Sequence, residues 1–135
     1  RSSAASDVYK RQTYTKDHLE AFFELDTYFY SSFYTNNLLP AAINFTKNYR
    51  RWYGKEMDER YPKFGMLGFD TGYFFLKGLA RYGSSFEKNM QGLDLIPIQT
   101  GFKFQRVNNW GGFINKKVFF VHFTKNFELV KLDFD

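Results

Sequence analysis

Cysteine is absent from the 135 residues, which excludes a disulfide scaffold, a zinc knuckle and a thiol nucleophile. Proline occurs only three times. No apolar run approaches the roughly 20 residues that a membrane-spanning helix needs, so we expect no membrane insertion of this segment. The lack of cysteine is compatible with the cytosol and with the periplasm, and it leaves the compartment open.

Aromatic residues, in contrast, are abundant. They make up 22% of the chain, with 18 Phe and 10 Tyr, and 44% of all residues are hydrophobic. This composition argues against intrinsic disorder, and the length fits at most one domain. The formal net charge of +5 suggests anionic partners.

We expect the first twelve residues to differ in origin from the rest of the chain. Residues 2–12, SSAASDVYKRQ, resemble the translation of an adapter used in transposase-based sequencing libraries. We therefore expect residues 1–12 to be adapter-derived and disordered, and residues 13–135 to be the truncated C-terminal portion of a longer protein. Without residues 1–12 the chain has 16 basic and 13 acidic side chains, and a net charge of +3 is ordinary.

Two stretches in the first half carry apolar residues at helical spacing. Residues 16–25 predict a short helix. A longer helix is predicted after Asn36 and Asn37, which offer an N-cap, and Gly54 is expected to end it. Residues 28–34 between them, YFYSSFY, are aromatic and polar without a helical stripe, and they predict a strand.

A third helix is predicted from Pro62 to Gly83. Four glycines inside it would each cost a helix up to about 1 kcal/mol relative to alanine. We therefore expect them to allow close approach of a neighbouring backbone. These glycines are Gly65, Gly68, Gly72 and Gly78.

The chain changes to a strand-like pattern in its last third. Residues 102–107, 118–123 and 127–132 predict a three-stranded meander, with turns at 108–112 and at 125–126. Helices followed by strands make this an α/β fragment.

The motifs of common catalytic sites are missing. Neither His18 nor His122 belongs to a two-histidine metal motif, and no glycine-rich phosphate loop or GxSxG nucleophile elbow occurs. We therefore predict no catalytic residue, no metal and no cofactor.

Two aromatic clusters suggest binding. The tyrosines of residues 28–34 suit a polar small-molecule cleft, although an aromatic strand packed in a core explains them as well. Residues 49–52, YRRW, mix aromatic and basic side chains as single-strand nucleic-acid binders do. A helix there points the arginines away from the apolar stripe, so we expect a solvated face and no nucleic-acid partner.

The order of these signals resembles a known family. A strand YSSFY, a helix with FTKNYRRWYG, a helix PKFGMLGFDTGYFFLKGLARYG and a final GFKF with a hairpin resemble the C-terminal part of type 1 periplasmic-binding-like proteins. More narrowly, they resemble an envelope group of amino-acid transporter substrate-binding-like proteins that often carry LysM modules upstream. The resemblance covers residues 26–132.

The resemblance implies candidate site residues. Asp70 falls in the family's Gly-Tyr-Asp element, in which Phe69 replaces the usual tyrosine and removes a hydroxyl. Tyr34 matches a position close to an interlobe crossover, where relatives have ligand-facing residues. Together with Tyr73 these give the candidate ligand-binding set, which is Tyr34, Asp70 and Tyr73.

The resemblance also implies a fold and a function. The fold is the C-terminal part of two α/β lobes that close on a ligand by hinge motion. The function is reversible, non-catalytic capture of a small polar, amino-acid-like ligand in the periplasm or cell envelope, with an ABC transporter as the implied partner. The alternative is a structural envelope protein on the same fold, attached to peptidoglycan through upstream LysM modules and without a transported solute.

Overall fold

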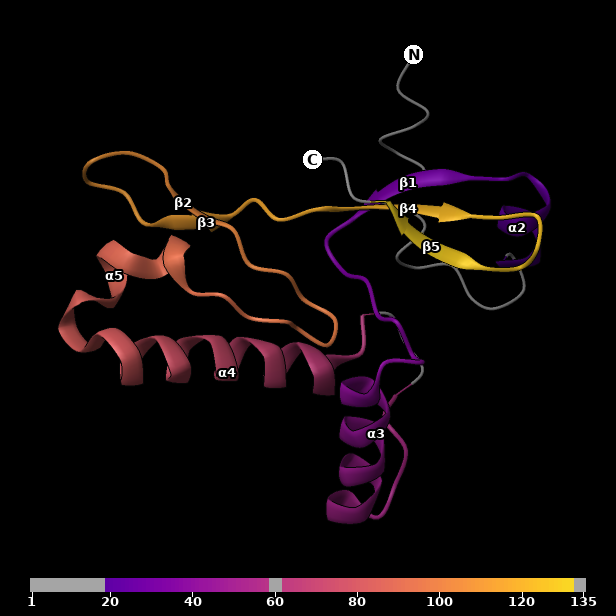
Figure 1. Ribbon diagram of the computed structural model, residues 1–135, viewed down its shortest axis with the longest axis horizontal. Coiled ribbons are helices and arrows are strands. Elements are labelled where there is room, and N and C mark those ends of the chain that lie inside the picture. The colour runs from indigo at the N-terminus through magenta and orange to yellow at the C-terminus, as the bar shows by residue number, and fades with distance from the viewer. Residues whose placement is uncertain (1–18, 59–61, 133–135) are drawn as a thin grey trace. The chain divides into compact units, whose positions relative to one another are not determined.

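The computed structural model describes residues 19–58 and 62–132. The disorder expected for residues 1–12 and the beginning of the first predicted helix lie outside the described residues. The chain divides into two compact units (Figure 1). Unit 1 comprises Arg1–Tyr34 and Val118–Asp135, and unit 2 is the continuous segment Thr35–Lys117. The chain therefore crosses between the units twice.

Unit 1 is a three-stranded antiparallel sheet with a short helix. The helix α2 spans Leu19–Glu24 and the strands are β1 (Tyr28–Ser31), β4 (Phe119–Phe123) and β5 (Leu129–Leu132). The strand order is β1-β4-β5. Alternate residues of the central strand β4 are buried, as expected for a strand with one face on a core.

Aromatic rings form the core of unit 1. Phe23 of α2 meets the ring of Phe123 edge-on, with centroids 4.8 Å apart, and Phe29 stacks on the same ring at 5.0 Å. The predicted strand at residues 28–34 is confirmed at its beginning. It ends early because Ser31 turns the chain, with its hydroxyl donating to the Phe33 carbonyl and accepting from the Phe33 N–H.

The predicted C-terminal meander is wrong in one strand. The hairpin of β4 and β5 is present, but β1, and not residues 102–107, pairs with the other edge of β4. Tyr28 lies opposite His122 and Tyr30 lies opposite Phe120, so large rings face one another across the pair. The strand at residues 104–106 pairs instead with its own neighbour across the turn.

Unit 2 contains the long helices. Its elements are α3 (Pro40–Tyr53), α4 (Phe64–Tyr82), a 3-10 turn at Gly83–Ser85, α5 (Phe86–Asn89), a second 3-10 turn at Met90–Gly92, β2 (Phe104–Arg106) and β3 (Phe113–Asn115). The strands β2 and β3 form a separate antiparallel ribbon. Every pairing between described strands is antiparallel, so the mixture of helix and sheet is confirmed without a parallel strand pair.

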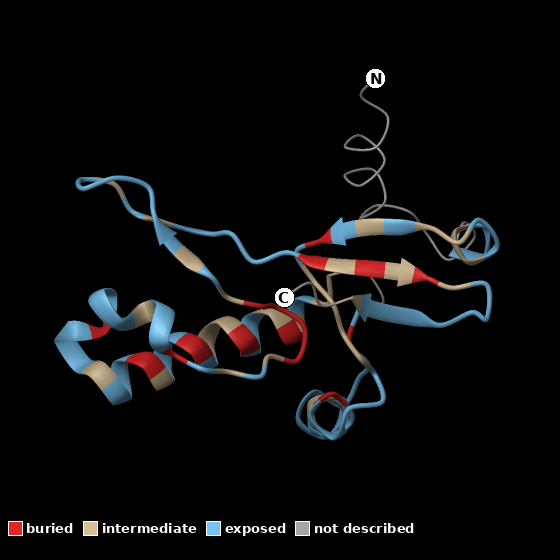
Figure 2. Ribbon diagram, turned by 45° about the horizontal axis from the view of Figure 1, so that its top comes forward, coloured by how far each residue is buried: buried red, intermediate tan, exposed pale blue. Residues whose placement is uncertain are grey.

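Two apolar clusters hold unit 2 together along α4. Near the start of α4, Met66 packs with Ala42, Met57 and Ile98. Further along, Phe74 packs with Phe86 and Leu93, and the rings of Phe102 and Phe104 lie 4.5 and 5.3 Å from it. Figure 2 shows the buried positions recurring along one side of α4.

The predicted C-terminal end of α3 is confirmed, and its predicted N-cap is wrong. Gly54 ends the helix in the left-handed conformation at φ 66°, as expected. The expected N-cap at Asn36 or Asn37 is wrong, because Leu39 occupies the cap position and Pro40 begins the helix. Asn36 instead accepts a hydrogen bond from the Leu38 N–H, which forms a turn just before the helix.

The glycines of α4 divide into two kinds. A β-carbon on Gly78 would overlap the ring of Phe86, and one on Gly65 would lie 3.0 Å from the Tyr49 ring. Gly68 and Gly72 have open space where a β-carbon would go. The expected close approach therefore occurs at two of the four, and it is made by side chains and not by a neighbouring backbone.

This difference gives a matched pair of substitutions on one helix. We expect Gly78→Ala to lower the free energy of unfolding by about 1–3 kcal/mol, because Phe86 must leave its place over the helix. Gly72→Ala should raise it by up to about 1 kcal/mol through helix propensity alone. Urea unfolding of both variants measures the difference, and equal effects would show that Phe86 does not pack on Gly78.

Candidate functional site

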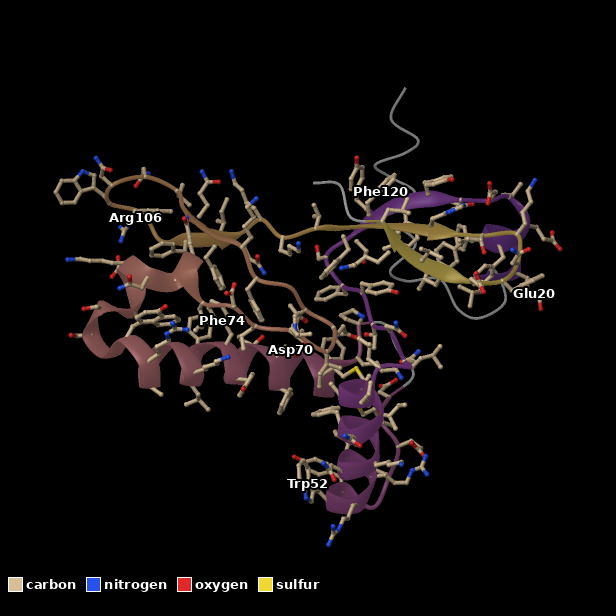
Figure 3. All side chains as sticks on the ribbon, viewed as in Figure 1. Glu20, Trp52, Asp70, Phe74, Arg106 and Phe120 are labelled. Carbon is tan, nitrogen blue, oxygen red and sulfur yellow. The ribbon has the colours of Figure 1, made fainter. Side chains whose placement is uncertain are left out.

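Asp70 is a buried acid in the middle of α4, with 3% of its surface exposed. Its carboxylate accepts three hydrogen bonds from consecutive backbone N–H groups: Oδ1 from Ile98, and Oδ2 from Gln99 and Thr100, each at 2.8 Å. Hydrogen bonds to a charged acceptor are stronger than neutral ones and offset the cost of burying the group. Figure 3 shows Asp70 and Phe74 on the side of α4 that faces the segment leading to β2.

Gln99 ties the same segment to the beginning of α4. Its side chain is completely buried, and its amide makes two hydrogen bonds to the backbone of Lys63. Oε1 accepts from the Lys63 N–H at 2.9 Å, and Nε2 donates to the Lys63 carbonyl at 3.1 Å. Lys63 is the N-cap residue of α4, so this amide replaces a side-chain cap.

These bonds form one buried polar cluster, which we call the Asp70 knot: Asp70, the backbone of residues 98–100, and the Gln99 amide on Lys63. The Thr100 hydroxyl is buried beside it without a hydrogen-bond partner in the described part of the chain. Both oxygens of the Asp70 carboxylate thus accept hydrogen bonds from the protein itself. That Asp70 contacts a ligand stays a prediction. Its structural role follows from the three hydrogen bonds, which attach residues 98–100 to α4.

Tyr73 has different surroundings from Asp70, although it lies only three residues further along α4. It is 48% exposed, and its ring stacks on Phe69 with centroids 5.8 Å apart. The Lys77 ammonium lies 5.8 Å from the centre of the Tyr73 ring and donates to the Asp94 carbonyl. Tyr73 therefore presents a phenol beside a positive charge at the surface of unit 2.

Tyr73 ends a row of aromatic side chains that spans both helices. Neighbouring ring centroids lie 4.7 to 6.2 Å apart. In order the rings are Tyr53, Tyr49 and Phe45 from α3, and Phe69 and Tyr73 from α4. Phe69 packs between Phe45 and Tyr73, which is consistent with a purely apolar side chain at a position where the resembled family has tyrosine.

Tyr34 is the last residue of the first of the two segments that make up unit 1. It is half-buried, and its ring lies 6.1 Å from that of Phe119. Asp70 and Tyr73 belong to unit 2. The structure thus assigns the three candidate residues to three different local environments.

A polar contact in unit 1 was also not predicted from the sequence. His122 on β4 bonds through Nε2 to Asp26 Oδ1 at 2.8 Å, and the ring of Tyr28 stacks on the imidazole at 3.9 Å. Asp26 has a φ of 53°, which is uncommon for a residue other than glycine. The partners are 96 residues apart, so neither spacing nor periodicity could have revealed them.

Among the described residues, no group of three or more His, Cys, Asp and Glu side chains could hold a metal ion. Within the same ranges, no helix combines the length and the apolar character needed to cross a membrane. Comparison of the chain with protein-family models, with curated proteins and with solved structures found no match.

The Asp70 knot can be tested by a substitution that keeps the size of the side chain. In Asp70→Asn the amide nitrogen must face at least one backbone N–H, so we expect the free energy of unfolding to fall by about 2–4 kcal/mol. Asp94→Asn is the control, because the Asp94 side chain is exposed and the change should stay within about 0.5 kcal/mol. Urea unfolding of both variants measures these two changes in the free energy of unfolding. Equal stability of the two variants would contradict the structural role of Asp70.

Proposed function

We propose that the chain is the C-terminal part of a type 1 periplasmic-binding-like protein of the cell envelope. In this proposal it captures a small polar, amino-acid-like ligand reversibly and without covalent chemistry. The ligand would be passed to a transporter or sensed. The starting point is the resemblance of residues 26–132 to the C-terminal part of that family.

The observation that carries the proposal is the division of the chain. The first crossing between the units falls directly after Tyr34, and the second falls between Lys117 and Val118. The resemblance implies an interlobe crossover close to Tyr34. A crossing at this position agrees with the place at which the resemblance implies an interlobe crossover, and this agreement supports a binding protein of the two-lobed type.

The surroundings of Tyr73 supply the chemistry that an amino-acid-like ligand needs. A half-exposed phenol can donate or accept a hydrogen bond, and the nearby Lys77 ammonium can pair with a carboxylate. In this proposal Asp70 acts indirectly, because the Asp70 knot holds the helix that carries Tyr73 and Lys77. Tyr34 is retained as a direct contact.

Two observations favour the alternative, a structural envelope protein without a transported solute. Both oxygens of the Asp70 carboxylate accept hydrogen bonds from backbone N–H groups, and Phe69 lacks the hydroxyl of the family's usual tyrosine. Both residues contribute packing and hydrogen bonds within unit 2. In this alternative the protein has the fold of the resembled family but transports no solute, and upstream LysM modules attach it to peptidoglycan.

A thermal-shift screen of the full-length gene product against the amino acids distinguishes the two. A ligand that binds the native state stabilises it by about 2.7 kcal/mol at a concentration 100 times its Kd, so the melting temperature rises. We expect at least one amino acid to raise it. We also expect Tyr73→Phe to reduce that rise, because the substitution removes only the hydroxyl.

Tyr53→Phe is the matched control. Tyr53 stands at the opposite end of the aromatic row and is also exposed, so the rise should survive its substitution. The structural alternative would replace the proposal if two results came together. The protein would melt cooperatively with the same melting temperature in the presence of every amino acid, and it would be retained on isolated peptidoglycan. A rise that Tyr73→Phe and Tyr34→Phe leave unchanged would retain the binding function and reject these two residues as contacts.

A further inference from the structure

The ribbon of β2 and β3 has two unlike faces. Phe104 pairs with Asn115, Gln105 with Ile114 and Arg106 with Phe113. Because side chains alternate between the faces of a strand, Phe104, Arg106 and Phe113 share one face. Gln105 and Ile114 point to the other. Lys103 and Lys116 continue that second face at the base of the ribbon, where the Lys116 N–H donates to the Lys103 carbonyl.

The first face packs on the helices of unit 2. The ring of Phe104 lies 5.3 Å from that of Phe74 on α4, and Arg106 forms a salt bridge with Glu87 on α5. The guanidinium of Arg106 also lies over the Phe113 ring, 4.8 Å from its centre. This face is therefore occupied, and the ribbon is held firmly in its place in unit 2.

The tip of the ribbon displays an aromatic residue that has no packing role. Trp110 is 98% exposed, the highest value among the large hydrophobic residues described. The turn that carries it is nevertheless ordered by hydrogen bonds. Asn108 Oδ1 accepts from the N–H groups of Trp110 and Gly111, and Arg106 donates to the Gly111 carbonyl at 3.3 Å. Figures 1 and 2 show this loop extending past the two strands, with most of its residues exposed.

The second face changes from apolar to cationic with distance from the tip. Val107 and Ile114, nearest the tip, are 57% and 45% exposed. At the base, Lys103 and Lys116 are exposed and lie opposite each other across the two strands. Like charges directly opposite repel, so this pair destabilises the free ribbon. An anionic partner would relieve that repulsion.

The charge of the surrounding segment has a single sign. No Asp or Glu occurs between Asp94 and Glu128, whereas Lys103, Arg106, Lys116 and Lys117 fall inside this interval and within unit 2. On the second face Ile114 lies two residues from Lys116, or about 7 Å along a strand that rises about 3.3 Å per residue. That spacing matches the depth over which an interfacial segment passes from lipid headgroups to the acyl boundary, about 5–10 Å.

We propose that the β2–β3 ribbon docks on an anionic lipid bilayer. Trp110 enters the interfacial zone, Val107 and Ile114 follow it, and Lys103 and Lys116 meet the headgroup phosphates. Indole rings favour this zone because one edge is polar and the body is apolar. The docking takes place at the headgroup level and needs no spanning helix. It is independent of whether the protein binds a solute.

The two tryptophans of the chain allow a direct test. Trp52→Phe leaves Trp110 as the only tryptophan, so that excitation at the red edge of the absorption band reports on Trp110 alone. Trp110→Phe leaves Trp52, which is 67% exposed near the C-terminal end of α3. Each variant is titrated with vesicles of equal parts phosphatidylglycerol and phosphatidylcholine, and with pure phosphatidylcholine vesicles. We expect a blue shift of Trp110 emission, and quenching by brominated lipid, with the anionic vesicles only. Trp52 should show neither change.

Binding strength is measured by co-sedimentation with the same vesicles. Trp110→Gln should weaken binding about tenfold or more, through the loss of a buried apolar side chain. Lys103→Gln with Lys116→Gln should weaken it about 30-fold, as expected from removing two cations near an anionic surface. Lys55→Gln with Lys88→Gln removes two charges elsewhere in unit 2 and should have a much smaller effect.

Three results would overturn the proposal. Unchanged Trp110 emission with anionic vesicles would exclude insertion, and equal binding to both vesicle types would exclude the charge argument. A shift of Trp52 in place of Trp110 would assign the contact to α3. Circular dichroism and size-exclusion chromatography of each variant confirm that it is folded, so that a negative result counts against the proposal.

Discussion

Unit 2 depends on a buried carboxylate that is satisfied entirely by the backbone. Asp70 accepts hydrogen bonds from three consecutive N–H groups of a segment that is distant in the chain. The bonds fix residues 98–100 against the middle of α4, while Gln99 fixes them against its beginning. The partners of Asp70 are 28 to 30 residues away in the chain, so the carboxylate closes a long loop.

The rest of unit 2 follows from this attachment. Once residues 98–100 are held on α4, Ile98 joins the cluster around Met66, and Phe102 and Phe104 reach Phe74 a few residues later. The ribbon of β2 and β3 begins where this packing ends, so its outward face and its tip stay exposed. One polar cluster thus positions both the helix that carries Tyr73 and the ribbon that carries Trp110.

Periodicity was enough to predict that α3 and α4 are helices, but not which side of each is buried. Ala42 is the one buried residue that α3 contributes among the described residues, and the buried side of α4 carries Asp70 and Gly78 beside Met66 and Phe74. Periodicity also failed for contacts between distant residues. The three-stranded sheet needed β1, which is separated from β4 by the whole of unit 2, and local pattern favoured a neighbour instead. The space over Gly78 is filled by Phe86 of α5, in a segment for which the local pattern predicted neither a helix nor a strand. At the candidate site, the sequence marked Asp70 as important, but its partners are backbone groups, which leave no trace in residue type.

Amide hydrogen exchange of the folded protein tests the central claim, that the Asp70 knot holds unit 2 together. If it does, the amides of Ile98, Gln99 and Thr100 open only when the unit opens, and they should exchange as slowly as the amides in the middle of α4. Exchange of these three amides as fast as that of the exposed Ile96 would show that the segment opens by itself. That result would contradict the account.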